Sequence, residues 1–531
     1  MIAMTKKAAA MLFSALSSKG RATLLLVLGL TLLPAVPRAQ GQEESGASGG
    51  EQPPNVLFIA VDDLRPQLES YGKPRMHTPN IDRLAAEGVR FTRHYVQAPT
   101  CGASRYSMLM SQRLRRSRSA TYSNGAFSLL SEPDSSRPAA LPRHFRQNGY
   151  YTVSIGKVSH SPDGRRHEKT TRPGATDDRK APPQMPNSWD EVYGPRGPWN
   201  TAWRAFFAYA GGKSRDRGET PATESATVSD TGYPDGLMAE MAVEELQTLQ
   251  EHDQPFFLAV GFYKPHLPFT APQKYWNLYD RDRIGLAAHP LVPAGVDPGV
   301  SLHGSGELFG GYGGAARGDS ITEAKARTLR HGYYAATSYT DAQVGKVLDA
   351  LERLGMKENT IVVLWGDHGW HLGNLSVWGK HTLYEFALRS PLIVRAPGVT
   401  TPEGRAARTP VESLDIYPTL ADLCGLPVPE AVDGESLMPF LKRPDRPSEG
   451  AAAFGYWRSQ GDWGKTVRTG RYRLTRWAND EGKRAQVELY DHRVDPNETE
   501  NVADQHPAVV RRLMRRLKMD DQRVKQASSD Q

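Results

Sequence analysis

The stretch PNVLFIAVDD, residues 54 to 63, is an uninterrupted apolar run that ends in two aspartates. A second run of the same kind, TIVVLWG at residues 360 to 366, is followed by Asp367 and His368. Apolar runs without polar alternation are typical of central strands in a parallel sheet that helices cover on both faces. Open α/β sheets bind their ligands at the carboxyl ends of such strands. Both acidic pairs are therefore predicted to lie at a ligand site.

Two further apolar runs end in polar residues. YYTVSI, residues 150 to 155, leads into Lys157 and His160, and PFFLAVGF, residues 255 to 262, leads into His266. A single ending of this kind is more often a solvated loop than a site. Four strand ends that carry Asp, His and Lys together indicate one shared pocket, because such groups gather where binding sites are built.

Helical patterns lie between these strands and indicate the fold class. They cover residues 80–87, 141–148 and 333–354, and a glycine follows each of them. Alternating strands and helices predict an α/β fold with a doubly wound, mostly parallel sheet.

The chain has 531 residues and 39% hydrophobic content, enough for one large domain and a smaller one. Strand patterns recur near the C-terminus at residues 452–456, 466–474 and 486–490, before a helical pattern at 507–518. We expect a secretory signal segment at 1–40, a flexible linker at 41–53, a catalytic domain at 54–432 and a smaller C-terminal subdomain at 433–531.

The expected signal segment has a basic start, an apolar run at residues 22–33, and then Pro34 and small residues. The run is too short to span a bilayer comfortably. An uncleaved membrane anchor is the alternative. We expect export to the periplasm or secretion, without stable membrane insertion after the signal is removed.

The formal net charge of +7 is concentrated in this leader. Residues 1–40 carry five basic side chains and no acidic one, which leaves +2 for the remaining chain. Two local basic runs, at 113–118 and 511–516, could attract a polyanion, and a solvated basic surface explains them equally well. We expect no nucleic-acid partner.

Cys101, in QAPTCGASRYSML, is one of only two cysteines. It follows a Pro-Thr turn signal and precedes the first turns of a predicted helix. A residue there lies near the positive end of the helix dipole, a place suited to an anion. A disulfide with Cys424 and a buried apolar role remain alternatives.

The candidate residues have complementary chemistries. Carboxylate oxygens suit Ca²⁺ or Mg²⁺, cationic side chains stabilise anionic substrate oxygens, and imidazoles move protons near neutral pH. These three groups are, in order, Asp62, Asp63 and Asp367, then Arg105, Lys157 and Lys380, then His160 and His266.

These stretches also resemble, in order, the type I sulfatases of the alkaline phosphatase superfamily, from about Pro54 to the end of the chain. CGASR is similar to the C-x-P/A-x-R signature in which sulfatases have their cysteine oxidised to formylglycine. GKVSH, KPHLPF and DHGW with WGKH look most like iduronate-2-sulfatases. The other matching segments are NVLFIAVDD, TPNIDRLAAEGVRFTRHY and HGYYAATSYTDAQVG.

The resemblance implies a sulfuric ester hydrolase that acts on a sulfated sugar or polysaccharide, such as a glycosaminoglycan. It also implies a maturing enzyme that converts Cys101, a Ca²⁺ ion with Mg²⁺ as the alternative, and a small antiparallel sheet with a helix in the C-terminal subdomain. The implied metal ligands are Asp62, Asp63, Asp367, His368 and the residue made from Cys101. The implied catalytic residues are Cys101, Arg105, Lys157, His160, His266 and Lys380.

Two positions depart from the family pattern: Ala103 stands where many members have proline, and residues 374–377 differ from the usual sequence near Lys380. Residues 188–210 and 304–318 look like insertions that either line a sugar site or pack as loops. A phosphoester or phosphonate hydrolase of the same superfamily is one alternative function. An unmatured protein that only binds sulfated glycans is another.

Overall fold

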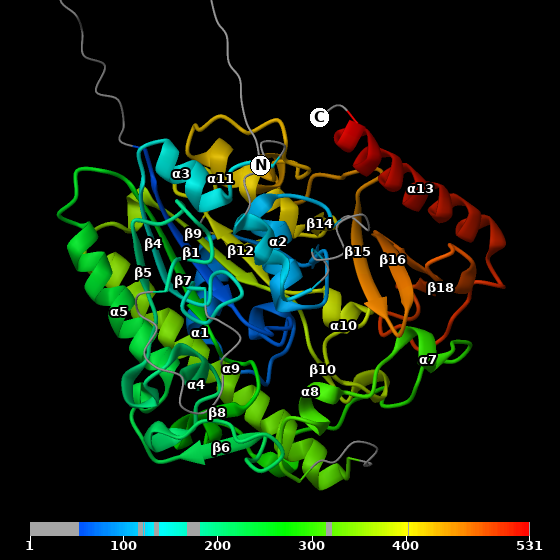
Figure 1. Cartoon of the computed structure of the whole chain (residues 1–531), viewed down its shortest axis with the longest axis horizontal. Coiled ribbons are helices and arrows are strands. Elements are labelled where there is room, and N and C mark those ends of the chain that lie inside the picture. The colour runs from blue at the N-terminus through cyan, green and yellow to red at the C-terminus, as the bar shows by residue number, and fades with distance from the viewer. Residues whose placement is uncertain are drawn as a thin grey trace, which may run out of the picture. The chain divides into compact units, whose positions relative to one another are not determined.

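The computed structural model describes residues 53–114, 121, 123–131, 137–166, 181–314, 321–401 and 403–529. Its centre is an eight-stranded sheet with the strand order β13-β2-β12-β9-β1-β7-β4-β5 (Figure 1). The strands are β1 (Asn55–Val61), β2 (Val89–Phe91), β4 (Tyr151–Gly156), β5 (Glu191–Tyr193), β7 (Phe256–Phe262), β9 (Thr360–Gly366), β12 (Leu392–Arg395) and β13 (Arg405–Ala407).

Strand β1 lies in the middle of this sheet and pairs in parallel with β7 and β9. Strand β4 is parallel to β7 and β5, whereas β12 is antiparallel to both of its neighbours. The predicted α/β fold with a mostly parallel sheet is therefore confirmed.

Helices cover both faces of the sheet, as the apolar runs indicated (Figure 1). Successive side chains of a strand point to opposite faces. Val56, Phe58 and Ala60 of β1 pack into one core cluster, and Leu57 and Ile59 pack into another. The helices on the first face are α2 (Cys101–Met110), α3 (Leu141–Gln147) and α11 (Ile416–Leu423); those on the second are α1 (Pro79–Glu87), α5 (Pro234–Leu249) and α9 (Glu323–Arg353).

Helix α9 begins ten residues before the predicted start at Tyr333. Its N-cap is Thr322, whose side chain accepts a hydrogen bond from the Lys325 amide. The first turns are polar and expose much of their surface, so apolar periodicity does not reveal them. The N-cap threonine is the local signal that marks the true start.

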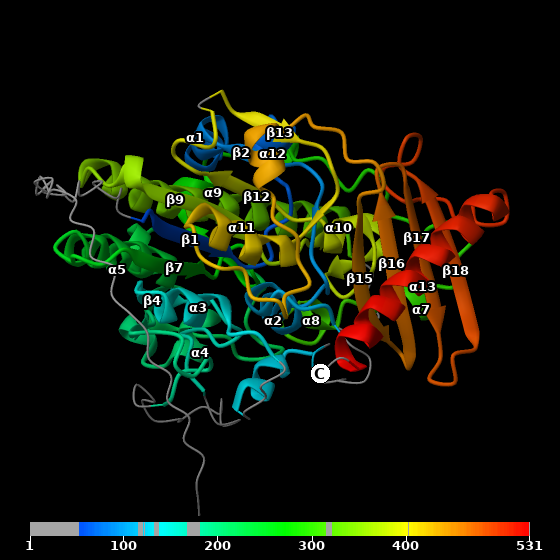
Figure 2. The same ribbon diagram turned by 90° about the horizontal axis from the view of Figure 1, so that it is seen from above.

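The C-terminal sheet consists of β15 (Ala452–Ser459), β16 (Asp462–Thr469), β17 (Tyr472–Ala478) and β18 (Arg484–Asp491), paired antiparallel in that order. The single strand predicted at 466–474 is wrong, because the chain turns at Gly470 and Arg471 and forms a hairpin there. Helix α13 (Pro507–Ser529) runs past the predicted end at 518 and lies across this sheet (Figure 2). Leu513 and Leu517 anchor it on Leu474 and Leu489.

The C-terminal sheet and its helix confirm the predicted α+β architecture of this part, while the domain boundaries at 54, 432 and 433 stay predictions. The shorter elements are β3 (His94–Tyr95), β6 (Thr223–Ala226), β8 (Phe269–Pro272), β10 (His371–Leu372), β11 (Trp378–Gly379), β14 (Val411–Glu412), α4 (Ala202–Phe206), α6 (Gln273–Trp276), α7 (Pro298–Ser301), α8 (Gly306–Phe309), α10 (Glu385–Leu388) and α12 (Met438–Lys442).

The predicted signal segment at 1–40 and most of the linker at 41–53 lie outside the described residues. Among the helices of the described part of the chain, none combines the length and apolar character needed to cross a membrane.

Candidate active site

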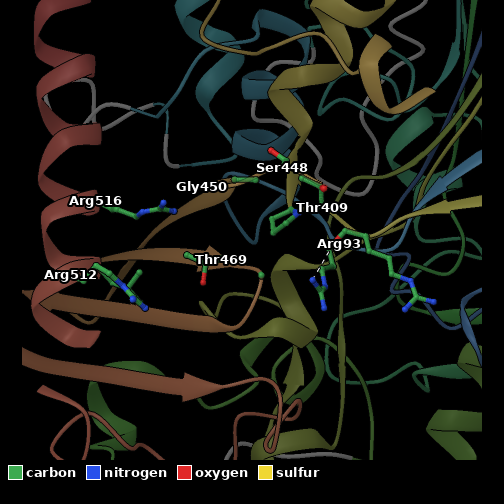
Figure 3. Close-up of a pocket in the computed structure, with 12 residues that line it drawn as sticks. Arg93, Thr409, Ser448, Gly450, Thr469, Arg512 and Arg516 are labelled. Carbon is green, nitrogen blue, oxygen red and sulfur yellow. Dashed lines mark hydrogen bonds between the residues drawn. The ribbon is translucent and has the colours of Figure 1, made fainter. Parts of the chain in front are cut away.

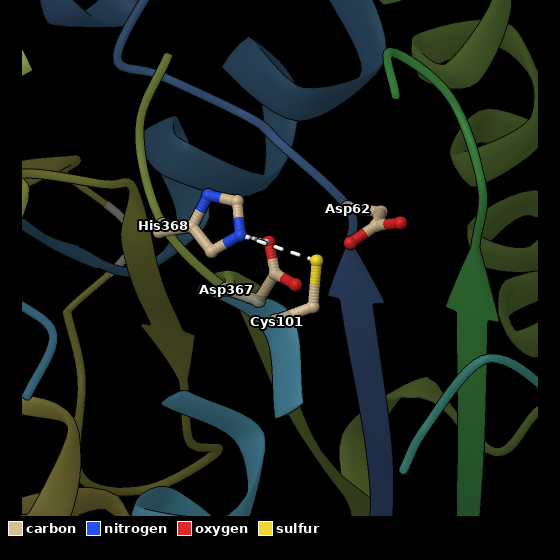
Figure 4. Close-up of side chains that lie close together, drawn as sticks. All are labelled: Asp62, Cys101, Asp367 and His368. Carbon is tan, nitrogen blue, oxygen red and sulfur yellow. Dashed lines mark hydrogen bonds and ion pairs between the residues drawn. The ribbon is translucent and has the colours of Figure 1, made fainter. Parts of the chain in front are cut away.

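The carboxyl ends of the central strands carry the predicted acidic and basic residues. Asp62 and Asp63 follow β1, Asp367 and His368 follow β9, and Lys157 follows β4. All five are almost completely buried. Because these strands are neighbours or near neighbours in the sheet, their ends meet at one edge, and Figure 4 shows Asp62 on one side of Cys101 and Asp367 and His368 on the other.

Cys101 is the first residue of helix α2, as the turn signal before it predicted. The Gly102 amide donates to Asn124 Oδ1 over 3.0 Å, and Thr100 Oγ1 donates to the same oxygen over 3.1 Å. A side chain at Gly102 would place its Cβ 2.4 Å from the Cα of Asn124. The glycine of the CGASR motif is thus required by the segment that packs against the start of the helix.

The Cys101 sulfur faces the nitrogens of a lysine and a histidine. Sγ lies 3.4 Å from Lys380 Nζ and 3.3 Å from His368 Nε2. Burial, with a smaller contribution from Asp62, raises the pKa of the Cys101 thiol to about 12. Both cysteines are free and buried, so the alternative of a disulfide with Cys424 is excluded. Unmodified, Cys101 is a neutral thiol among strongly polar neighbours.

Arg105 lies one turn into α2 and holds the two acidic strand ends together. Its Nε donates to Asp367 over 2.8 Å, and Nη2 lies 3.3 Å from Asp62. Nη1 donates to the carbonyls of Lys157 and Val158. All three guanidinium nitrogens are engaged and the side chain is fully buried. Arg105 therefore positions the two carboxylates, whereas its charge alone predicts a contact with the substrate.

The two lysines pair with different aspartates. Lys157 Nζ lies 2.5 Å from Asp62 Oδ2, and Lys380 Nζ lies 2.8 Å from Asp63 Oδ1. Burial raises the pKa of Asp62, but Lys157 and further cations outweigh it and hold that pKa well below its usual range. For Asp63, burial dominates over Lys380 and raises the pKa well above its usual range.

The residues around Cys101 fit a hard divalent cation. One ligand atom each from Asp62, Cys101, Asp367 and His368 lies within 4.8 Å of the others, and so do atoms of Asp63, Cys101 and His266. Among the described residues, Asp63 Oδ2 is a buried oxygen without a hydrogen-bond partner. A buried carboxylate oxygen with no donor retains a lone pair for a cation. We call these six residues, together with Arg105, Lys157 and Lys380, the active-site cluster.

Glu307, which the sequence did not single out, also enters this cluster. Its Oε1 lies 3.0 Å from His266 Nε2, and its Oε2 lies 3.5 Å from Lys380 Nζ. It lies on α8, inside the stretch 304–318 that was expected to be an insertion near a sugar site or a packed loop. It is the only charged residue from 304 to 314, which is the signal that could have identified it.

His266 is fixed on its loop by backbone contacts. Its Nδ1 lies 2.6 Å from the Leu267 carbonyl oxygen, so that nitrogen carries the hydrogen. The buried Lys264 ammonium donates to the carbonyls of His266 and Pro268 and stabilises the loop. Nε2 is left facing Glu307 and, at 3.8 Å, Asp63.

His160 is a predicted site residue that no hydrogen bond of the described residues joins to the others, and His266 is linked to Lys380 through Glu307. In the described part of the chain its Nδ1 is buried without a partner, and its ring packs edge-on near Trp203. Burial, with a contribution from the nearby Lys157 charge, lowers the pKa of His160 well below its ordinary value. A neutral imidazole with an open nitrogen can accept a proton.

Comparisons with known proteins agree with this geometry. The Sulfatase family model matches residues 54–426, and the model for the N-sulphoglucosamine sulphohydrolase C-terminal region matches residues 366–525. The chain belongs to the sulfatase family. Because it belongs to this family, it is a sulfuric ester hydrolase. The family is part of the alkaline phosphatase superfamily that the sequence motifs indicated.

Relatives of the sulfatase include an iduronate 2-sulfatase of Mus musculus, 32% identical over 76% of this chain and 73% of the mouse protein. A sulfatase of Formosa agariphila is 31% identical over 90% of this chain and 88% of its own length. A structure solved with D-glucosamine-2-N,6-O-disulfate as its substrate matches with a TM-score of 0.68, 20% identity, and coverage of 90% and 99%. The phosphonate monoester hydrolase of Silicibacter pomeroyi also matches, with a TM-score of 0.68, 24% identity, and coverage of 88% and 95%.

Proposed function

We propose that this sulfatase removes sulfate from a sulfated sugar or polysaccharide in the manner of the iduronate-2-sulfatases. The observation that supports the proposal most is the position of Cys101, at the amino end of α2 and within 3.4 Å of Lys380 and His368. In the CGASR motif this cysteine is the residue that maturation converts to formylglycine. The relatives with the iduronate-type name support the choice of substrate class.

We assign the metal site to Asp62, Asp63, Asp367 and His368, with Ca²⁺ as the ion and Mg²⁺ as the alternative. Three buried carboxylates are ligands that hard cations prefer, and the open Oδ2 of Asp63 fits such an ion. A bound divalent cation supplies charge that offsets the negative oxygens of a sulfate ester. Asp62 and Asp367 are held in place for it by Arg105.

Formylglycine at position 101 supplies two hydroxyl groups on one carbon once it is hydrated, one to attack sulfur and one to release sulfate. Lys157 and Lys380 provide positive charge beside that position. Burial strengthens such charges, because little water competes for them. Asp367, the carboxylate that accepts from the Asp63 amide, is placed to accept a proton from the attacking group.

Proton transfer to the leaving alcohol falls to His266 or Lys380, and we assign the later deprotonation to His160. His266 Nε2 is directed into the cluster because its Nδ1 is fixed by a carbonyl oxygen. His160 keeps an open ring nitrogen near Lys157. Each of these two assignments is tested by its own alanine variant.

The deciding experiment compares kcat/KM for one sulfate ester and the matching phosphate ester. With matured protein we expect a strong preference for sulfate, loss of activity with a chelator, and restoration by Ca²⁺ without enhancement by Zn²⁺. A preference for phosphate that zinc strengthens would show a phosphoester or phosphonate hydrolase instead. A screen of defined sulfated oligosaccharides then assigns the sugar and linkage.

Maturation and export are parts of the same proposal. We propose that a formylglycine-generating or sulfatase-maturing enzyme converts Cys101 and that the chain is periplasmic or secreted after the signal at 1–40 is removed. Mass spectrometry of the native protein tests both, through the residue-101 peptide and through the mature N-terminus. An unmodified cysteine in the native host would support a protein that only binds sulfated glycans.

A further inference from the structure

Four arginines from three separate segments converge on a cavity of about 460 Å³ beside the C-terminal sheet (Figure 3). Arg93 precedes β3, Arg408 precedes β14, and Arg512 and Arg516 lie on α13. The cavity shares no residue with the active-site cluster. It is therefore a strongly cationic place that is separate from the active-site cluster.

None of the described residues that line this cavity is acidic, and none is aromatic. Its walls add the hydroxyl groups of Thr409 and Ser448 and the backbone of Gly450 and Gly470. Arg512 and Arg516 are four residues apart on α13, so they project from the same side of the helix. Figure 3 shows both extending from the helix towards the cavity, opposite Arg93.

Neighbouring arginines outside the cavity differ from these four, because each of them pairs with a carboxylate. Arg405 lies 3.5 Å from Asp445, Arg468 lies 3.4 Å from Glu385, and Arg471 lies 2.5 Å from Asp491. In the described part of the chain no carboxylate pairs with the four arginines of the cavity, and the Arg93 guanidinium donates only to the Arg408 carbonyl.

Unpaired positive charges that lie close together repel one another, which costs free energy. A bound anion would remove that cost. Burial lowers the pKa of Arg93, and the nearby Arg468 adds to this effect. A guanidinium presents several N–H donors in a planar fork that matches the oxygens of a sulfate group. Four such forks around one cavity suit a ligand that carries more than one sulfate.

We propose that this cavity is a secondary binding site for a sulfated oligosaccharide chain. The choice of a sulfated glycan rests on the proposed function. The walls favour it over single-stranded nucleic acid, because they offer no aromatic side chain on which a base could stack. The volume lies within the range of about 300 to 1,000 Å³ that is usual for small-ligand sites and holds a short segment of the chain.

The test uses the double variant Arg512→Gln/Arg516→Gln and a matched control on the same helix. Arg511 and Arg515 are exposed and do not line the cavity, so Arg511→Gln/Arg515→Gln removes the same charge from the same helix. Binding of a heparin octasaccharide is measured by titration calorimetry in a Cys101→Ser background, which prevents turnover. Its chemically desulfated counterpart is measured in parallel.

We expect the cavity variant to bind the octasaccharide at least about tenfold more weakly. The control should lose less than about twofold, since its two arginines do not line the cavity and their charges are screened by salt. The desulfated chain should bind none of the proteins. In the matured enzyme the cavity variant should raise KM for a long sulfated chain and leave kcat/KM for a small aryl sulfate unchanged.

Three results would overturn the proposal. These are equal losses in the cavity and control variants, no loss in either, and equally tight binding of a DNA oligonucleotide of matched charge that the cavity variant also weakens. The aryl sulfate measurement separates a failure of this cavity proposal from a failure of the proposed function. If matured native protein does not hydrolyse the aryl sulfate, the function is wrong, while the calorimetry still decides the cavity.

Discussion

Two buried clusters in this protein contain the same kinds of charged groups and differ in what they leave unpaired. One is the active-site cluster. The other, the C-terminal ion-pair cluster, lies between the α10 segment and the C-terminal sheet and consists of Glu385, Arg468, Arg473, His492 and Glu498. Both place two or more acidic groups and a histidine close enough to hold a metal ion.

In the C-terminal ion-pair cluster the protein itself fills all four carboxylate oxygens. Glu385 accepts from the Tyr95 hydroxyl and from Arg473 over 3.0 and 2.7 Å. Glu498 accepts from Arg473 over 2.5 Å and from the Glu385 amide over 2.7 Å. Burial raises the pKa values of both glutamates, but the arginines outweigh it and hold them below their usual range.

In the active-site cluster the protein leaves Asp63 Oδ2 without a donor. Burial therefore dominates at Asp63 and moves its pKa in the opposite direction. The composition of a cluster is thus a poor guide to its role. The difference lies in whether donors of the protein occupy every carboxylate oxygen, as in a structural network, or whether an oxygen remains for a ligand.

The largest expected effect comes from Cys101→Ser in the matured protein. We expect turnover of sulfate esters to fall by at least about 10⁴-fold, because serine cannot supply two hydroxyl groups on one carbon. The same substitution at the other buried cysteine, Cys424→Ser, is the control and should keep its turnover. Thermal unfolding of both variants checks the fold, and full activity of Cys101→Ser would refute the formylglycine mechanism.

The next effect belongs to the C-terminal ion-pair cluster. Glu498→Gln should lower the free energy of unfolding by about 3–5 kcal/mol, since it leaves Arg473 buried with less compensation. Urea unfolding followed by tryptophan fluorescence measures it, and the exposed Glu500→Gln should change little. Turnover in the absence of urea should persist, which separates a structural role from a catalytic one.

The loss of unfolding free energy in Glu498→Gln should depend on pH, in the direction set by the pKa shift of Glu498. The folded-state pKa of Glu498 lies below the ordinary 4.5, so its stabilisation is fully present above that pH. It is lost as the pH falls through the lower folded-state value. The wild type and Glu498→Gln should thus differ most near neutral pH and converge in acid. A constant difference down to acid unfolding would contradict the ion-pair account.

The sequence predicts the fold and much of the site because those features are local. An apolar run followed by Asp62 and Asp63, or by Asp367 and His368, identifies both the strand and its polar end without knowledge of the rest of the chain. The start of helix α2 at Cys101 is also predicted locally, from the Pro-Thr turn signal before it. The hairpin at Gly470 was missed because Val467, Tyr472 and Leu474 are the only apolar residues from 466 to 474, too few for periodicity alone to divide the segment.

The missing parts of the site depend on contacts between distant segments. Glu307 reaches Lys380 from the four-residue helix α8, which is too short to show periodicity, over a separation of 73 residues. Arg105 was expected to face the substrate, and only the meeting of β1, β4 and β9 shows that its nitrogens are engaged by the protein. Whether Asp63 Oδ2 has a donor is likewise decided by packing.

A smaller effect is expected from Asp63→Asn, and it addresses the open oxygen directly. The variant should bind Ca²⁺ at least about 100-fold more weakly, because it replaces an anionic ligand by a neutral amide of the same size. Equilibrium dialysis with calcium measures it. Glu498→Gln is the matched control, and its calcium affinity should be unchanged. If both variants bind calcium more weakly, the C-terminal ion-pair cluster also holds metal, and the distinction drawn between the two clusters is wrong.

The smallest expected effect is that of Glu307→Gln, which tests the carboxylate that enters the active-site cluster from α8. Its two oxygens face His266 and Lys380, so it orients both groups but also places a negative charge close to the sulfate. Loss of orientation should lower kcat by about tenfold. Loss of the negative charge should at the same time leave KM unchanged or reduce it, because an anionic substrate meets less repulsion. Steady-state kinetics on one aryl sulfate separates the two constants. A higher KM with unchanged kcat would mean that Glu307 binds the substrate itself, and the exposed Glu219→Gln provides the reference for a change of charge alone.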